Sequence, residues 1–142
     1  MKTARTLITI CLLLTAATLF AQTESQQLMK VNVPFSFGVG DRSLPAGEYS
    51  IFTVTPERSI RIVSADGKYA AVINTLPNYA HAPSTKSRLV FHKYGDQYFL
   101  AQVWTAGQDV GRNPLPGRKA MDLASSGETL QTFTILALAD HR

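Results

Sequence analysis

Few side chains in this sequence have the types and spacing that chemistry requires. Histidine, the commonest general base and metal ligand, occurs three times, at His81, His92 and His141. These fall in a predicted loop, in a predicted strand and at the C-terminus, and no H-x-H or H-E-x-x-H spacing joins them. A zinc site needs three or four nitrogen, oxygen or sulfur ligands brought together. We therefore expect neither a metal site nor a cofactor.

Serine and carboxylate chemistry finds no clearer support. The G-x-S-x-G turn that exposes a nucleophilic serine is absent from the sequence. A glycosidase needs two acids facing each other across a cleft, whereas acids such as Asp66 and Asp96 stand in predicted turns, where turn chemistry explains them. We expect no catalytic residue, and a cofactor-free hydrolase is the weakest of the functional alternatives.

Aromatic side chains are better candidates for recognition, because each combines a large apolar surface with a polar edge. Tyr79 stands in a proline-bounded segment and is the aromatic residue most expected to be exposed. The competing interpretation, in which most of these rings are core or cross-strand partners, stays open and is the more favoured one. The candidate ligand-binding residues are Tyr79, His81, His92, Tyr94 and Trp104.

The element that must position most of these residues is a hairpin predicted over Lys86–Trp104. Two aromatic-rich runs flank Gly95-Asp96, and a Gly-x pair between such runs signals a two-residue loop. An unbroken register from that loop places Val90 opposite Ala101. Because neither face of the hairpin is clearly polar, we expect the core on one side and a cover on the other. That cover is a helix, a loop, a ligand or a second subunit.

A second hairpin is predicted from Ser59–Ser64 and Tyr69–Leu76, because an Asp-Gly pair stands between them. Pro34 cannot donate to a sheet ladder, so its strand is expected at an edge or a bulge. Gly127 suits the C-terminal cap of a helix. The other expected elements are strands at 29–37, 48–55 and 129–139, a short helix at 118–126, and Pro/Gly-rich loops at 38–47, 77–86 and 105–117.

Short strands separated by turn signals are typical of all-β domains. We predict a single antiparallel β-sandwich or small barrel of about 7–8 strands, with one short helix near residues 118–126. The sequence does not decide between sandwich and barrel.

The N-terminal segment is predicted to direct export. Lys2 and Arg5 precede an apolar run 14 residues long, Leu7–Phe20, and Ala21 follows as a plausible cleavage point. This is the pattern of a secretory signal peptide, and the apolar run is short for a membrane span. We therefore expect a signal peptide at 1–21, a flexible leader at 22–28 and a single β-domain at 29–142, periplasmic or extracellular, with no transmembrane span after cleavage.

The composition of the mature chain argues against thiol chemistry and against nucleic-acid binding. The only cysteine, Cys11, lies in the signal segment, so the mature chain has neither a disulfide nor a thiol nucleophile. Beyond residue 21 the chain carries 12 Lys and Arg against 10 Asp and Glu, with no basic stripe. We therefore do not expect nucleic acid as a partner.

Three sequence motifs together resemble the pattern of a known protein family. They are VPFSF at 33–37, LPAGEY at 44–49 and YGDQYFL at 94–100. The combination resembles a family of small, uncharacterised secreted bacterial proteins and spans most of the mature chain. The resemblance implies one exported all-β domain and carries no activity with it.

We therefore predict an exported, non-catalytic β-domain that binds a small molecule, a glycan or another envelope protein. The first alternative is a structural or assembly subunit of the cell envelope, in which case the chain forms oligomers.

Overall fold

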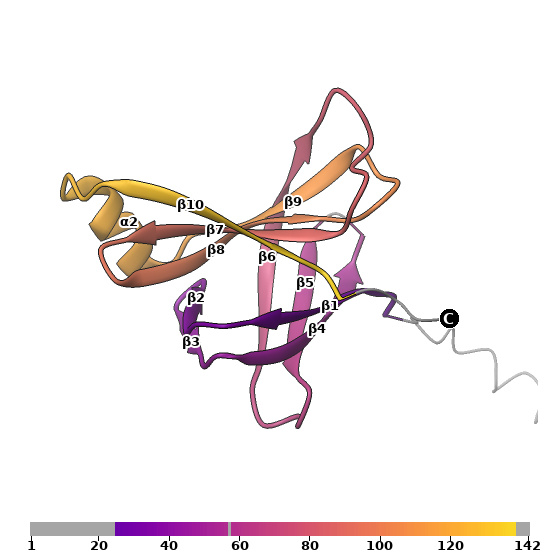
Figure 1. The fold of residues 1–142 in the computed structure, drawn as a ribbon, viewed down its shortest axis with the longest axis horizontal. Coiled ribbons are helices and arrows are strands. Elements are labelled where there is room, and N and C mark those ends of the chain that lie inside the picture. Colours follow the sequence, from indigo (N-terminus) through magenta and orange to yellow (C-terminus); the bar gives the residue numbers. More distant parts are fainter. Residues whose placement is uncertain (1–24, 57, 139–142) are drawn as a thin grey trace, which may run out of the picture.

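The computed structural model describes residues 25–56 and 58–138 and confirms an all-β fold with one short helix (Figure 1). Within these residues, ten strands form a single mixed sheet that is not closed. The predicted signal peptide lies outside the described residues. Among the residues that are described, no helix has the length and apolar character needed to cross a membrane.

The strands and the helix follow one another closely along the chain. They are β1 Gln27–Val33, β2 Phe37–Val39, β3 Arg42–Leu44, β4 Gly47–Thr55, β5 Ser59–Ser64, β6 Ala70–Tyr79, β7 Arg88–Tyr94, β8 Gln97–Trp104, β9 Val110–Pro114, α2 Arg118–Ser125 and β10 Leu130–Leu136.

The long strand β6 joins the two halves of the sheet. Its residues 70–74 pair with β5, and residues 75–79 pair with β9. From β5 the sheet continues through β4 to β1, and from β9 through β8 and β7 to β10. The β2–β3 hairpin joins β8 through a parallel pair, Phe37 with Tyr98, so the sheet is mixed rather than purely antiparallel as expected.

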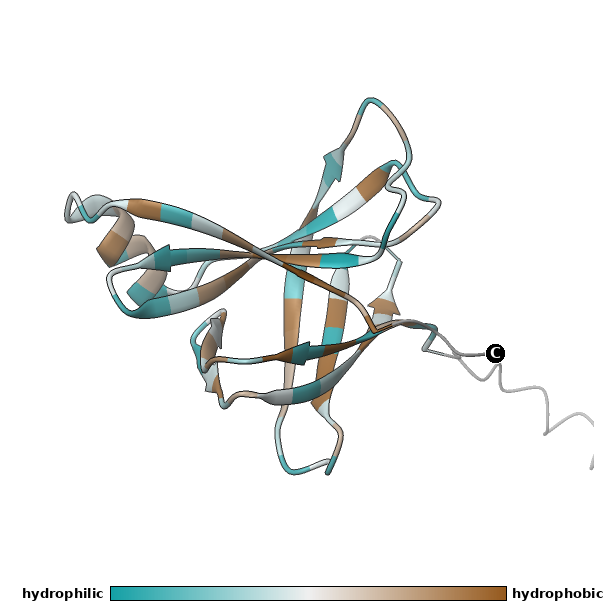
Figure 2. Cartoon of the chain, viewed as in Figure 1, coloured by the Kyte–Doolittle hydropathy of each residue, from teal (hydrophilic) through white to brown (hydrophobic). Residues whose placement is uncertain are grey.

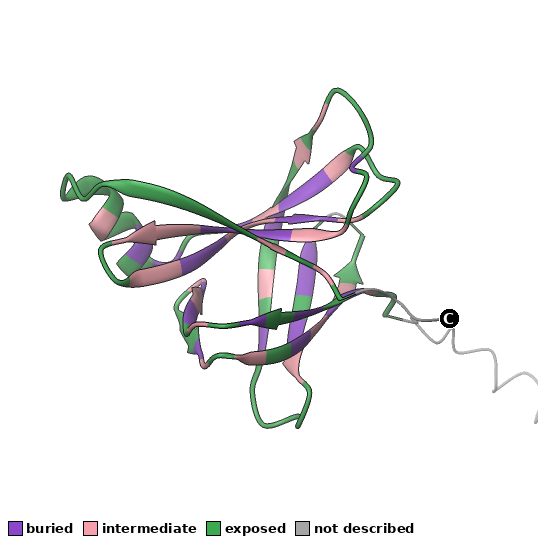
Figure 3. Ribbon diagram, viewed as in Figure 1, coloured by how far each residue is buried: buried purple, intermediate pink, exposed green. Residues whose placement is uncertain are grey.

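The hydrophobic core lies between the β1–β4–β5 part of the sheet and the β7–β8 part (Figures 2 and 3). Val31, Ile51, Leu89 and Phe91 are each at most 1% exposed. The ring of Phe37 packs edge-on against Phe91, with ring centroids 5.4 Å apart. Burial of these side chains is the main force that holds the two parts together.

The β5–β6 hairpin confirms the predicted register, with Ile62 opposite Ala71 and Arg61 opposite Val72. Its turn is stabilised by the Asp66 carboxylate. That group accepts hydrogen bonds from the Ser64 hydroxyl at 2.6 Å and from the Lys68 backbone N–H at 3.0 Å.

The β7–β8 hairpin confirms the predicted register only near its turn. Phe91 faces Leu100 as expected. Val90, however, faces Gln102 rather than Ala101, because a β-bulge lies between Val90 and Phe91. Gly95 has a φ of +56°, which suits a two-residue loop. The bulge shifts the register by one residue, and Val103 consequently lies in the core, fully buried.

Pro34 marks the end of β1, which is an edge strand as predicted. The strand expected over 29–37 was wrong in extent, because the chain turns at residues 34–36 and continues as β2. β1 also begins at Gln27, two residues inside the segment expected to be a leader. Pro34 has no backbone N–H to donate, so the hydrogen-bond ladder of β1 ends there.

Three predicted loops were wrong in part. The segment 38–47 contains the end of β2, all of β3 and the first residue of β4. The segment 105–117 contains β9, and the segment 77–86 begins with the last three residues of β6. The two strands pair over five residues, from Thr75 with Pro114 to Tyr79 with Val110. Neither stretch alternates apolar and polar residues, so periodicity did not reveal the pair. With β2, β3 and β9 added, the strands number ten rather than seven or eight.

The helix and the closing strand are confirmed. α2 covers Arg118–Ser125, and Gly127 follows with a φ of +83°. β10 pairs with β7 along its whole length, from Leu130 with Tyr94 to Leu136 with Arg88.

Candidate ligand-binding site

The outer face of the β7–β8 hairpin, opposite the core, has the cover that the sequence predicts. The cover is α2 together with residues 114–117, which lead into it. His92, Tyr94 and Phe99 lie on this outer face. Only one helical residue, Ala120, is buried, so α2 does not close completely onto the sheet.

The start of α2 is held by the turn between β2 and β3. The Arg118 backbone N–H donates a hydrogen bond to the Asp41 carboxylate, at 2.8 Å, across 77 positions of sequence. This carboxylate acts as a cap for the helix, whose preceding residue provides no side-chain cap. Gly117 packs directly on the backbone of Gly40, where there is no room for a side chain.

Between α2 and the outer face lies a cavity of about 370 Å³, which we call the α2 pocket. Its volume falls within the range of small-molecule sites. Its lining contains no Asp, Glu, Lys or Arg, and its polar side chains are those of His92, Tyr94 and Asn113. The apolar side chains that line it are Leu76, Phe99, Leu100, Ala101, Pro114, Leu115, Pro116, Ala120, Met121 and Ala124.

Three large apolar side chains of this lining are exposed to solvent. Leu76 is 58% exposed, Leu115 is 40% exposed and Met121 is 51% exposed. They come from β6, from the segment after β9 and from α2. Apolar side chains gathered around a concave site are a common feature of ligand-binding pockets.

The polar groups of the α2 pocket are suited to hydrogen bonding with a neutral molecule. Burial lowers the pKa of His92 below its ordinary value of 6.5, which favours the uncharged imidazole with one donor and one acceptor. The Asn113 side-chain oxygen accepts a bond from the Asn78 amide at 3.2 Å. Tyr94 lies beside Phe99, with ring centroids 6.3 Å apart.

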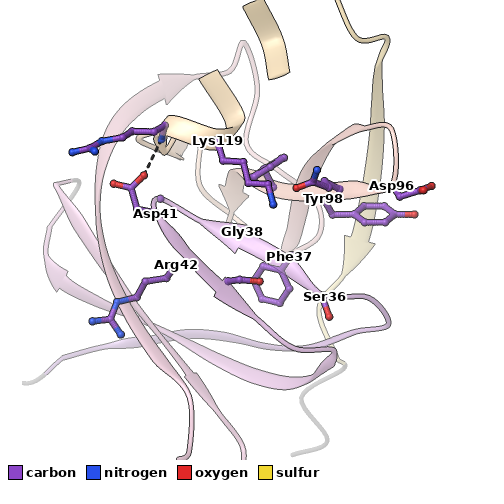
Figure 4. Close-up of a pocket in the computed structure, with 13 residues that line it drawn as sticks. Ser36, Phe37, Gly38, Asp41, Arg42, Asp96, Tyr98 and Lys119 are labelled. Atoms are coloured by element: carbon purple, nitrogen blue, oxygen red, sulfur yellow. Dashed lines mark hydrogen bonds between the residues drawn. The ribbon is translucent and has the colours of Figure 1, made fainter. Parts of the chain in front are cut away.

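A second, more polar cavity of about 330 Å³ lies near the start of α2 (Figure 4). It shares Gly38, Gly40 and Phe99 with the α2 pocket. Figure 4 shows the Lys119 side chain reaching over Gly38, while the Arg42 guanidinium points away from Tyr98. Asp41 already accepts the helix N–H, so its carboxylate has a structural role here.

The structure brings together only some of the residues expected to bind a ligand. His92 and Tyr94 line the α2 pocket, whereas Tyr79 and His81 lie outside both cavities. Tyr79 stands at the end of β6 and is 72% exposed, and His81 is exposed in the following loop.

Trp104, the remaining candidate, is a packing residue. It is 6% exposed, and its indole N–H donates to the Gln102 side-chain oxygen at 2.8 Å. The Arg88 guanidinium lies over its ring at 5.3 Å from the centroid. These contacts use both the polar edge and the face of the ring, which supports the cross-strand interpretation of this residue.

The pocket residues that sequence reasoning missed come from α2 and the segment before it, and also from β6, β8 and β9. Leu115 stands between two prolines, and Met121 belongs to the apolar side of a short helix. Those patterns indicate a loop and a helix, but they do not indicate which surface the helix covers.

His92 is the histidine that lines the α2 pocket, and the structure describes residues 25–56 and 58–138. No hydrogen bond within these ranges joins His92 to a serine or a carboxylate. The same ranges contain no group of three potential metal ligands.

Comparison with known proteins finds no matching family model, no similar curated protein and no similar solved structure. The resemblance carried by the three sequence motifs therefore stays a prediction.

Proposed function

We propose that this chain is an exported, non-catalytic binding module and that the α2 pocket is its ligand site. The observation that carries the proposal is the charge-free, largely apolar lining of this pocket, ringed by exposed Leu76, Leu115 and Met121. Export is supported by the signal-peptide pattern of residues 1–21.

The lining also narrows the class of ligand. An ionised group placed in this cavity would lose hydration without finding an opposite charge, which is costly. A sugar would present more hydroxyl groups than His92, Tyr94 and Asn113 can satisfy. The pocket therefore suits a small neutral molecule with an apolar body and one or two hydrogen-bonding groups.

The proposal is tested with N-phenyl-1-naphthylamine, a neutral aromatic probe that fluoresces in apolar surroundings. We expect saturable binding to the mature chain, with one probe per molecule. Ala124→Phe adds a ring to the lining of the pocket and should weaken binding about tenfold or more. Ser125→Phe changes the next residue of α2, which is exposed and lies outside the pocket, and should leave binding unchanged.

The comparison of the two variants with wild type tests whether the probe binds in the α2 pocket. Equal binding by wild type, Ala124→Phe and Ser125→Phe would place the probe elsewhere and contradict the proposal. Circular dichroism and the melting temperature of each variant verify that both remain folded.

A further inference from the structure

The closing strand β10 pairs with β7 along one edge, and no strand of the described part of the chain lies beside its other edge. Within residues 25–56 and 58–138, β10 pairs with β7 alone. Figure 1 shows β10 running along the outside of β7 and approaching β1 only at its C-terminal end. Figure 3 shows most of it as exposed. A strand edge of this kind is a template for another strand.

The backbone groups on this open edge follow from the pairing register. The Ala137 N–H donates to the Ser87 carbonyl at 2.9 Å, which continues the β10–β7 ladder. Bonded pairs alternate along an antiparallel ladder, so residues 131, 133 and 135 also bond to β7. The N–H and C=O groups of residues 130, 132, 134 and 136 therefore point outward. The Leu138 N–H follows the same alternation and reaches the Lys30 carbonyl at 2.8 Å.

The other outermost strands carry features that discourage pairing, and β10 carries none. β1 has the exposed Lys30, a register irregularity between Gln27 and Met29, and Pro34 directly after it. β3 is three residues long and begins with the exposed Arg42. β10 reads LQTFTIL, with no charge, no proline and no irregularity in its register. Charges, prolines, bulges and short length are the usual protections of a sheet edge.

The sequence of β10 is also nearly the same in both directions. A two-fold axis through Phe133 would place Leu130 opposite Leu136 and Thr132 opposite Thr134 of a second copy. These pairs join the residues whose backbone groups point outward, so every one of those groups meets a partner. Phe133 would face its own copy at a non-bonded pair, where side chains approach most closely.

The side chains of β10 also favour a second copy of the chain as the partner. Leu130 is 48% exposed and Leu136 is 51% exposed, and each would pack against the other in the second copy. Because β10 has no charge, self-pairing opposes no like charges, which would otherwise destabilise the pair. The contact is the same on both subunits, as a two-fold dimer requires.

We propose that two copies of this chain associate through β10, antiparallel, with the two-fold axis at Phe133. The sheet then continues from one subunit into the other. This interface is separate from the α2 pocket, and neither proposal depends on the other.

The register is tested by charge exchange on β10. Thr132→Lys/Thr134→Lys would place lysines opposite lysines, and Thr132→Glu/Thr134→Glu would place glutamates opposite glutamates. We expect the wild-type mature chain to be dimeric by size exclusion with light scattering, and each double variant alone to be monomeric. An equimolar mixture of the two should form dimers again, because each introduced lysine then faces an introduced glutamate.

A matched control carries the same charge on another strand. Val72→Lys/Asn74→Lys alters two exposed residues of β6 and should remain dimeric. Circular dichroism verifies the fold of every variant. A wild-type chain that is monomeric up to its solubility limit would overturn the proposal. So would double variants of β10 that still dimerise alone, since the interface would then lie elsewhere.

A cross-link provides a second measurement. The mature chain has no cysteine, so Phe133→Cys introduces the only thiol. At a non-bonded antiparallel pair the two Cα atoms lie within the span of a disulfide. Oxidation should therefore yield a covalent dimer nearly completely for Phe133→Cys but not for Val72→Cys. Equal cross-linking of the two variants would also overturn the proposed register.

Discussion

Substitution of Gly117 by alanine should detach the start of α2 from the β2–β3 turn. Gly117 has a φ of −76° and a ψ of 170°, which any residue adopts without strain. Alanine at such a position would ordinarily stabilise the protein slightly, by restricting the unfolded chain. Here, however, the added Cβ would overlap the Gly40 carbonyl and lie 2.8 Å from the Asp41 backbone nitrogen.

The expected loss of stability follows from the contacts that the added methyl group would disrupt. Forcing a methyl group into a packed contact costs about 1–3 kcal/mol. Moving the helix also breaks the bond from Arg118 to Asp41, and loss of a helix cap costs about 1 kcal/mol. The free energy of unfolding should therefore fall by about 2–4 kcal/mol. In a domain of this size each kcal/mol lowers Tm by about 4 °C, which gives about 8–16 °C.

Calorimetry or thermal circular dichroism measures this change, and Asp41→Ala is the matched variant. Asp41→Ala removes the cap without adding a methyl group, so it should lower Tm by only about 4 °C. The double variant should be less destabilised than the sum of the two, because Gly117→Ala already breaks the same bond. A Tm for Gly117→Ala at or above that of wild type would refute the packing of α2 described above.

Two further predictions concern pH. Because burial lowers the pKa of His92 below 6.5 in the folded state, the unfolded chain binds its proton more readily, and the free energy of unfolding should fall as pH drops below about 6.5. His92→Gln should flatten that slope in urea unfolding between about pH 5 and 7, and an unchanged slope would contradict the assignment. Bonds from Ser64 and Lys68 lower the pKa of Asp66 below its ordinary value of 3.8, so this carboxylate stabilises the β5–β6 turn above that pH and loses the effect as pH falls through its folded pKa. An NMR titration midpoint for Asp66 above 3.8 would contradict this, and Asp66→Ala should loosen the turn at neutral pH.

The parts of the fold that sequence reasoning predicted are those with local signals. The Asp-Gly turn determines the β5–β6 register, and the Gly95 turn determines the first four pairs of β7 and β8. The bulge between Val90 and Phe91 has no local signal, because it depends on which side chains the core accepts. β9 was missed because its residues, VGRNP, pair with β6 without any apolar–polar alternation.

Sequence reasoning predicted less of the candidate site than of the fold. The apolar faces of the β7–β8 hairpin predicted a cover, and His92 and Tyr94 were among the candidates. The contacts of the cover include the bond between Asp41 and Arg118, which lie 77 positions apart. No periodicity relates those two residues, so the pocket between α2 and the sheet follows only from the folded chain.

The most direct test of the α2 pocket uses methionine as a reporter. Met29 and Met121 are the only methionines beyond the predicted signal segment, and they occupy contrasting positions. Met29 is buried in the core at 5% exposure, whereas Met121 stands at the rim of the pocket. The mature chain labelled with ¹³C at its methionine methyl groups is titrated with N-phenyl-1-naphthylamine and followed by NMR. Saturable movement of the Met121 signal with a stationary Met29 signal is the predicted result. A Met121 signal that stays in place up to the solubility limit of the probe would contradict a ligand site in this pocket.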